Sequence, residues 1–389
     1  MKRWVSPLGI LNDQGGAALL ITLAVMAVMF SLSFEINRRI RLHIQVAEHT
    51  KARAVLRARA ESGLEIAKTL LVKDAMESRV DSLQEDWARP SVIEDLLAQL
   101  GYSPESLSLS IVDEVGKIQV NALVRQFPGH GGNPEQRILW ARFLSFFIGR
   151  DKSEDPRDSS QIINCITDWI DSRDDDRVTG VSGAESDYYQ GLDPPYFCPN
   201  APLYDLKEML KIKGVSPALL TVAGDRDNFL SREEASGPLE FQDVFTVFGA
   251  ESLKKKGKGK YAYPGKININ TAPAPVIAGI LPFGRSDAAV DIAEFRLEAA
   301  GDGEGFKNDI SQPGWYARVA GLSAEEKAAM EKKICYGSAF FRIESRARNQ
   351  ERGMTVEAVV RREKDKKGRW QCRTLLVRER VFVHSKTGP

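Results

Sequence analysis

The sequence predicts an α+β protein in which a long N-terminal helix precedes an antiparallel sheet, and a large helical domain interrupts that sheet. Three observations support this class. Residues 17–72 contain no proline, residues 107–124 and the last part of the chain from 338 alternate apolar and polar side chains, and helical patterns fill the chain between these β segments. Because the chain leaves a β pattern and returns to it, the helical part is predicted to be an insertion.

Composition sets wide limits on function. The chain has 389 residues, enough for two or three compact units. Its formal charge is +1, so no overall electric field favours nucleic acid or an acidic substrate. After residue 34 we find no second apolar run long enough to span a membrane.

Residues 17–34 carry no charge, and their length is close to the roughly 20 residues needed to cross a bilayer. A cleaved signal peptide would have a shorter apolar core followed by small residues. Here the small residues Gly15, Gly16, Ala17 and Ala18 come at the start of the apolar core. A retained membrane helix is therefore favoured, and a simple membrane anchor with a helical stalk remains an alternative.

The helical pattern continues beyond the apolar segment to about residue 72. Apolar residues recur at three- and four-residue spacings at Ile36, Ile40, Ile44, Ala47, Ala54, Ala58 and Leu64. A helix of about 55 residues is about 80 Å long, and its amphipathic second part needs a partner surface. Basic residues lie on both sides of the apolar segment, so the positive-inside rule leaves its orientation open. They are Lys2 and Arg3 before it, and Arg38, Arg39 and Arg41 after it.

The middle of the chain contains alternating helix and turn signals. Residues 74–104 are expected to form a helix pair that ends at Gly101, and residues 107–124 a β-hairpin with its turn at Glu114 to Lys117. Further helices are expected at 134–150, 161–176, 204–220, 272–283, 286–300 and 323–334.

The C-terminal part is predicted to be a three-stranded antiparallel meander. Residues 338–349, 352–363 and 369–383 alternate apolar and polar side chains, with turns at 349–353 and 366–368. The lysine- and glycine-rich residues 253–265 are expected to form a loop between two helical halves of the insertion.

Residues 168–189 form the densest acidic stretch of the chain. They contain Asp168, Asp171, Asp174, Asp175, Asp176, Glu185 and Asp187. Carboxylates this close repel one another unless a cation or solvent relieves them, and hard oxygen ligands on a flexible loop suit Ca²⁺. The spacing is not that of an EF-hand. A calcium site, a solvated acidic loop and a paired-carboxylate catalytic site therefore all remain open.

Other chemistries have less support. Residues 210–220 and 266–280 are similar to helix-hairpin-helix elements, whose turns present backbone N–H groups to DNA phosphates; this is the nucleic-acid alternative. The sequence has no nucleophile elbow, zinc-protease motif or phosphate-binding loop, so we do not expect an enzyme. The four cysteines, Cys165, Cys198, Cys335 and Cys372, could form up to two disulfides in an oxidising compartment, with the pairing undetermined.

The N-terminal pattern resembles that of type IV prepilins and type II secretion pseudopilins. A polar leader ends in a glycine and is followed by an apolar helix that becomes amphipathic. The resemblance implies cleavage by a prepilin peptidase between Gly16 and Ala17, and methylation of the new N-terminus. Most such proteins have glutamate at the fifth mature position, which here is Ile21. Protein K of type II secretion, a minor pseudopilin, typically lacks that glutamate.

Internal motifs also resemble the protein K family. They are Asp168, Trp169, Asp171, Gly183, Glu185, Tyr188 and Tyr189 in the acidic stretch, residues 208–215, and Asn268, Asn270, Thr271 and Ala272 further on. The resemblance implies a pseudopilin fold: a long N-terminal helix packed on an antiparallel sheet, with an inserted helical domain of two SAM-like units. The implied segments are a leader at 1–16, the helix at 17–75, a first α/β part at 76–125, the insertion at 126–335 with its units at about 126–250 and 266–335, and the meander at 336–389.

The resemblance further implies a non-enzymatic role at the tip of the type II secretion pseudopilus. The implied partners are minor pseudopilins I and J, the prepilin peptidase and inner-membrane lipid, with no nucleic acid. The bulk of the chain would lie in the periplasm. One or two Ca²⁺ ions are implied in the insertion, with Asp174, Asp175, Asp176, Glu185 and Asp187 as candidate ligands. A membrane-anchored DNA-uptake protein and a minor pilin of a type IV pilus remain alternatives.

Overall fold

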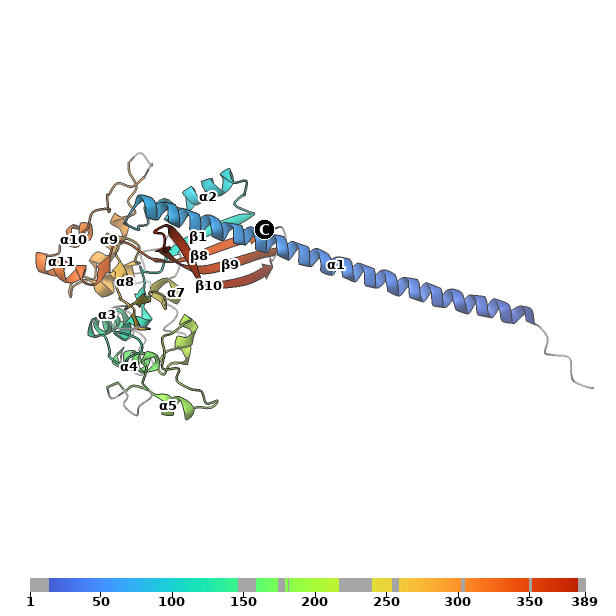
Figure 1. Cartoon of the computed structure of the whole chain (residues 1–389), viewed down its shortest axis with the longest axis horizontal. Helices are drawn as coiled ribbons and strands as arrows, with labels where there is room; N and C mark the ends of the chain where they lie inside the picture. Colours follow the sequence, from blue (N-terminus) through green and yellow to red (C-terminus); the bar gives the residue numbers. More distant parts are fainter. Residues whose placement is uncertain are drawn as a thin grey trace, which may run out of the picture. The chain divides into compact units, whose positions relative to one another are not determined.

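The computed structural model describes residues 14–145, 159–173, 179–180, 182–216, 240–253, 259–301, 305–349 and 352–383 (Figure 1). The chain divides into two compact units, residues 1–59 and residues 60–389. The described residues of the first unit, 14–59, are all helical. The second unit holds the sheet and the helical insertion, and each unit is described by itself.

Helix α1 spans Gln14–Glu77, so the predicted uninterrupted N-terminal helix is confirmed. Over residues 17–46 its apolar side chains are exposed: Leu20 is 70% exposed and Phe30 is 80% exposed. By length and composition this is the one described helix that could cross a membrane. Exposed apolar side chains over this length need lipid or partner helices around them.

The last part of α1, from Ala60 onward, belongs to the second unit and packs on the sheet through small residues. Ala60 and Ala67 are fully buried. A Cβ atom at Gly63 would collide with the Ser345 hydroxyl and would lie 3.2 Å from the Leu107 side chain. Gly63 is therefore required where the backbone of this helix approaches the sheet.

The sheet has four antiparallel strands in the order β1-β8-β9-β10. They are β1 (Leu107–Asp113), β8 (Phe340–Arg348), β9 (Arg352–Lys364) and β10 (Trp370–Val383). The register places Ile111 opposite Ile343 and Ile343 opposite Ala358, and the ladder between β9 and β10 has an irregularity between Thr374 and Leu376. The predicted C-terminal meander is confirmed.

The predicted hairpin at 107–124 is wrong. Strand β1 pairs with β8, more than 200 residues later in the chain, and the short β2 (Ile118–Gln119) pairs in parallel with β3 (Phe245–Thr246). The alternating apolar and polar residues do form strands, but these strands pair with distant parts of the chain and not with each other across a turn. Gly116 is needed here because a Cβ atom would meet the backbone of Thr271 and Ala272 at about 3.1 Å.

The predicted helix pair at 74–104 is half correct. The second helix is present as α2 (Pro90–Gln99), and Gly101 follows it with a φ of 85°. In place of the first helix, a loop leads to a single 3₁₀ turn, η1 (Asp86–Ala88). Trp87 in this turn is fully buried and lies edge-on to Phe341, so tertiary packing outweighs the helical pattern.

The insertion is a compact assembly of short helices between β1 and β8. In chain order they are η2 (Val120–Leu123), α3 (Pro134–Ser145), α4 (Ser159–Ile170), α5 (Ser186–Gln190), η3 (Leu206–Lys211), α7 (Phe241–Val244), α8 (Ala274–Ile280), α9 (Ala288–Phe295), α10 (Trp315–Val319) and α11 (Ala324–Glu331). Two-residue strands add β4 (Glu251–Ser252), β5 (Tyr261–Ala262), β6 (Ile267–Asn268) and β7 (Ile334–Cys335).

One hydrophobic cluster runs through the insertion from Ile118 to Ile334. Buried residues of both predicted SAM-like segments contribute to it, so the two segments share one core. The core begins before residue 126, because β2 and η2 already belong to it. The predicted fold class, a long helix on an antiparallel sheet with a helical insertion, is confirmed.

Candidate functional site

The family-like residues of the acidic stretch form a buried turn after α4, which we call the loop anchor: Asp168 with Thr179, Gly183 and Ala184. The Asp168 side chain is fully buried. Its carboxylate accepts the backbone N–H of Thr179 at 3.0 and 3.1 Å and that of Ala184 at 3.0 Å. Burial raises the pKa of Asp168, and these hydrogen bonds oppose the rise. The carboxylate therefore folds the acidic loop back onto α4.

Gly183 completes the loop anchor. A Cβ atom at this position would collide with the Asp168 carboxylate and would approach the Thr179 nitrogen to 2.9 Å. The spacing between Asp168 and the Gly183-Ala184 pair is thus explained by one local arrangement. Close packing of the chain requires glycine here.

Two aromatic residues of the same motif, Trp169 and Tyr189, pack in the core, and Tyr188 lies exposed beside them. The rings of Trp169 and Tyr189 meet edge-on at 4.8 Å, and Tyr188 contacts Tyr189 at 5.2 Å. The Lys213 Nζ atom lies 4.4 Å from the Tyr188 ring centroid. The backbone N–H of Lys213 donates to the Tyr189 hydroxyl at 3.4 Å. These contacts join the acidic segment to residues 208–215, the other family-like stretch of this region.

Three of the five predicted calcium ligands, Asp174, Asp175 and Asp176, lie outside the described residues. Of the other two, Glu185 is buried just before α5 and Asp187 is exposed in its first turn. Asp171 is a further buried carboxylate, and its backbone neighbour Arg173 donates to it at 2.9 Å. Burial raises the pKa of Asp171 to about 6. A cation bound to the loop would relieve this unfavourable burial, and oxygen donors of this kind fit Ca²⁺.

The second family-like motif forms a buried polar joint between the insertion and the sheet. The Asn268 amide nitrogen lies within 3.0 Å of the Asp81 carbonyl, the Asp113 carboxylate and the Ser338 hydroxyl. Thr271 donates to the same Asp113 carboxylate at 2.7 Å. This joint fixes β6 of the insertion to the ends of β1 and β8.

The turn after Asn268 is closed on itself. The backbone N–H groups of Thr271 and Ala272 both donate to the Asn268 carbonyl, and Trp315 donates its ring N–H to the Asn270 side chain at 2.8 Å. Asn268, Asn270 and Ala272 are fully buried. These N–H groups do not face a ligand surface, so the helix-hairpin-helix interpretation of residues 266–280 has no support in this turn.

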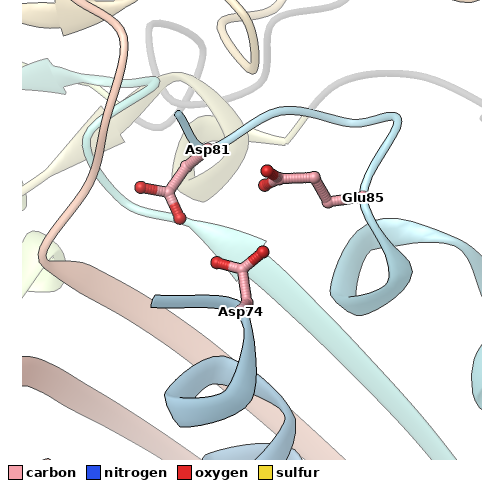
Figure 2. A group of neighbouring side chains, drawn as sticks. All are labelled: Asp74, Asp81 and Glu85. Carbon is pink, nitrogen blue, oxygen red and sulfur yellow. The ribbon is translucent and has the colours of Figure 1, made fainter. Parts of the chain in front are cut away.

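Sequence reasoning missed a buried ion cluster at the end of α1, the arginine cluster: Asp74, Asp81, Glu85 and Arg362. Figure 2 shows the three carboxylates pointing toward one another from the end of α1 and the loop after it. Their oxygens lie within 4.8 Å of one another. The Arg362 guanidinium binds Asp74 at 2.7 Å and Asp81 at 2.5 Å, and also donates to the Leu71 carbonyl.

The arginine cluster is an ion network and not a metal site, because the guanidinium already fills the place of a cation. Trp87 donates its ring N–H to Glu85 at 2.9 Å, and the Ser338 backbone donates to Asp81 at 2.6 Å. Burial raises the pKa of Asp81 to about 7 and that of Asp74 to about 6, against the opposing charge of Arg362. One guanidinium does not neutralise one buried and two half-buried carboxylates, so the cluster retains protons near neutral pH.

A second missed network lies at the turn after β1. Glu114 is fully buried and forms ion pairs with Lys117 at 2.7 Å and Arg342 at 2.8 Å. Burial favours the neutral carboxyl, but the two cations outweigh it and lower the pKa of Glu114 to about 2. The sequence predicted Glu114 in the turn of a hairpin. Glu114 instead connects the start of the insertion to β8.

The predicted N-terminal residues all lie on α1. A Cβ atom at Gly16 would meet no atom within 4 Å, and Ile21 is 63% exposed. Exposure of Gly16 is compatible with access by a peptidase, although cleavage between Gly16 and Ala17 stays a prediction.

All four cysteines carry thiols, and none of the disulfides that the sequence allowed is present. Cys165 donates to the Ser182 carbonyl at 3.3 Å, and Cys372 donates to the Lys68 carbonyl at 3.7 Å. Burial raises the pKa of Cys165 to about 11 and that of Cys335 to about 12, so these thiols stay protonated at neutral pH.

Comparison with known proteins finds a family match in the insertion. Residues 116–223 match the family model described as type II secretion system protein K. Protein K of Aeromonas hydrophila is 25% identical over 219 residues, which cover 53% of this chain and 60% of that protein. Protein K of Klebsiella pneumoniae is 24% identical over 209 residues, covering 54% of this chain and 60% of the relative. The match thus spans about 60% of the length of these relatives.

The fold comparison extends over most of the chain. A chain in the crystal structure of the GspK-GspI-GspJ complex from enterotoxigenic Escherichia coli superposes with a TM-score of 0.55 at 16% identity. The superposition covers 86% of this chain and 99% of that chain, so the fold is shared. The resemblance to protein K that the sequence motifs indicated is confirmed as a similarity, in sequence over part of the chain and in fold over most of it.

Proposed function

We propose that this relative of type II secretion system protein K is a non-enzymatic minor pseudopilin that acts at the tip of the pseudopilus. The observation that carries the proposal is the match of residues 116–223 to the protein K family. Those residues lie in the insertion and include the loop anchor, so the similarity concerns the part that distinguishes the chain from a simple pilin.

The membrane role rests on α1. The N-terminal part of this helix exposes apolar side chains over a length that fits a single crossing of the membrane. We propose that the prepilin peptidase first cuts after Gly16. The helix then stays in the inner membrane, with the bulk of the chain in the periplasm. During assembly the helix leaves the membrane and packs in the pseudopilus.

Ile21 supports a terminal position. A glutamate in lipid is costly unless a cation pairs with it. In pilins the partner of that glutamate is thought to be a neighbouring subunit's terminal amine, and a subunit with nothing above it does not need the carboxylate. Ile21→Glu should therefore leave secretion unchanged or reduce it slightly. A clear gain in secretion with Ile21→Glu would argue against the tip position.

The proposed partners are minor pseudopilins I and J of the same secretion system. The fold shared with a chain of the GspK-GspI-GspJ complex supports this choice. The test is co-purification of the full chain with its cognate I and J subunits from detergent-solubilised membranes. A complex of the three proteins is expected, and its absence when all three are present and folded would overturn the proposal.

Calcium is the proposed ligand of the acidic segment. The buried carboxylates of Asp171 and Glu185 beside the loop anchor support it. Calorimetry of the full chain should detect Ca²⁺ binding, and Asp187→Asn should weaken it. If chelation changes neither the thermal stability of the chain nor its assembly with I and J, the calcium proposal fails while the assembly proposal stands.

A further inference from the structure

Three arginines lie directly after the apolar segment of α1, and the proposed function does not account for them. Arg38 and Arg39 are 59% and 70% exposed, and both pair with Glu35, at 2.9 and 2.8 Å respectively. Arg41 makes only a 3.5 Å contact with the Asn37 side chain within this turn. Three guanidinium groups and one carboxylate leave a net charge of +2 on residues 35–41.

The spacing along the helix places these arginines at a defined depth. They follow Phe34 by four to seven residues, which is about 6–10 Å at 1.5 Å per residue. The polar headgroup layer begins at the edge of the hydrocarbon core and is roughly 5–8 Å thick on each side. When residues 17–34 span the bilayer, Arg38 and Arg39 therefore lie within the headgroup layer, and Arg41 lies about 2–3 Å beyond it, a distance that its long side chain can bridge.

Basic residues are more numerous after the span than before it. Residues 35–59 contain seven Lys and Arg against two Glu, a net charge of +5. Basic residues next to a span disfavour translocation of that flank, and the proposed function requires this flank to be translocated. An anionic partner on the translocated side would compensate this charge.

We propose that Arg38, Arg39 and Arg41 form a binding site for the phosphate headgroups of anionic phospholipids. This inference rests on the membrane anchoring in the proposed function. Guanidinium groups bind phosphate oxygens through paired N–H donors, and each basic side chain near an anionic surface adds to the attraction. At 100° per residue the three side chains spread over about 160° of the helix circumference, so they reach more than one headgroup.

Glu35 limits the strength of this site. Its carboxylate occupies donors of both Arg38 and Arg39, leaving fewer N–H groups for phosphate. Removal of the carboxylate should free them. Neutralising the arginines should therefore weaken phosphate binding, and neutralising Glu35, which lies within two turns of them, should strengthen it.

The test uses the full chain in bilayers of phosphatidylcholine that contain a minor fraction of spin-labelled lipid. Electron spin resonance then compares the association of labelled phosphatidylglycerol with that of labelled phosphatidylcholine at the helix. We expect a preference of roughly fivefold for phosphatidylglycerol at low salt, weakening at high salt. The triple variant Arg38→Gln, Arg39→Gln, Arg41→Gln should abolish the preference, and Glu35→Gln should increase it.

A matched control is Lys51→Gln with Arg53→Gln, which removes two charges about 25–29 Å beyond Phe34 and should leave the preference unchanged. Equal association of both lipids with the inserted wild-type chain would overturn the lipid site alone. Failure of the chain to insert even into phosphatidylcholine bilayers would instead overturn the anchoring on which the site rests. If the triple variant keeps its lipid preference but loses assembly with I and J, the arginines bind an acidic protein surface and the lipid proposal is wrong.

Discussion

The arginine cluster and the loop anchor bury carboxylates in two different ways. In the arginine cluster, the Arg362 guanidinium on β9 pairs with Asp74 and Asp81, and Glu85 accepts the Trp87 ring N–H. In the loop anchor, backbone N–H groups of Thr179 and Ala184 compensate the single carboxylate of Asp168. The first arrangement joins segments more than 280 residues apart, and the second closes a loop of 17 residues.

This difference teaches how each site depends on the fold. The loop anchor needs only a helix end and a turn, so its residues lie close together in the sequence and can be identified as a local motif. The arginine cluster exists only when α1 lies on the sheet, and it therefore reports on the packing of the whole second unit. Loss of Arg362, the cation of the arginine cluster, should therefore lower the free energy of unfolding more than a change in the loop anchor.

The largest expected effect is that of Arg362→Met. The methionine keeps much of the side-chain length but leaves buried carboxylates without a cation. We expect a loss of about 3–5 kcal/mol in the free energy of unfolding. Denaturant titration of the full chain in detergent, followed by circular dichroism, measures it.

Arg373→Met is the matched control for this prediction. Arg373 is on β10, is 55% exposed and pairs with Glu363 at 3.0 Å, so its loss should cost at most about 1 kcal/mol. In an Asp81→Asn background, Arg362→Met should cost less, because one buried charge has been removed. Equal losses for Arg362→Met and Arg373→Met would show that the cluster does not carry the packing of α1.

The second effect concerns the loop anchor. Gly183→Ala places a methyl group against the Asp168 carboxylate and the Thr179 nitrogen. Overpacking of this kind costs about 1–3 kcal/mol, and it should also weaken Ca²⁺ binding by displacing the acidic loop. The same titration with added Ca²⁺ measures both changes.

Gly131→Ala is the control, since a Cβ atom there would meet nothing within 4 Å. A Gly183→Ala chain as stable as the Gly131→Ala chain would mean that the turn after α4 has room for a side chain. The motif glycine would then need another explanation.

Much of the fold could be predicted because its signals are local. The continuous α1, the meander of β8, β9 and β10, and the single helices α9 and α11 follow from periodicity and turn residues within each segment. The hairpin prediction failed for the opposite reason. The partner of β1 is β8, and nothing in residues 107–124 indicates a strand that far along the chain.

The site residues divide in the same way. Asp168 and Gly183 could be found by their motif, since the geometry that needs them is short-range. Arg362 carried one weak signal, a charged residue at an inward position of β9 that follows the buried Ala358 and Val360. Its carboxylate partners come from α1 and the loop after it, so only the folded chain shows why the charge is tolerated.

The smallest expected effect is a pH dependence that separates the two regions. The pKa of Asp81 is raised from 3.8 to about 7, and that of Asp74 to about 6, chiefly by burial. A raised pKa means that the folded state binds protons more tightly than the unfolded state. The resulting stability is fully present below about pH 3.8 and is lost as pH rises through 6 to 7. The chain should therefore lose about 1–2 kcal/mol between pH 5.5 and pH 8.

Asp81→Asn should flatten this profile, because the amide copies the protonated carboxyl and no longer titrates. Asp171→Asn, next to the loop anchor, removes a carboxyl whose pKa is about 6 and should remove under about 1 kcal/mol of the same dependence. Melting temperatures of the three chains across this pH range give the comparison. If Asp171→Asn flattens the profile more than Asp81→Asn, the protons are held mainly in the insertion, and the arginine cluster is already neutralised by other groups.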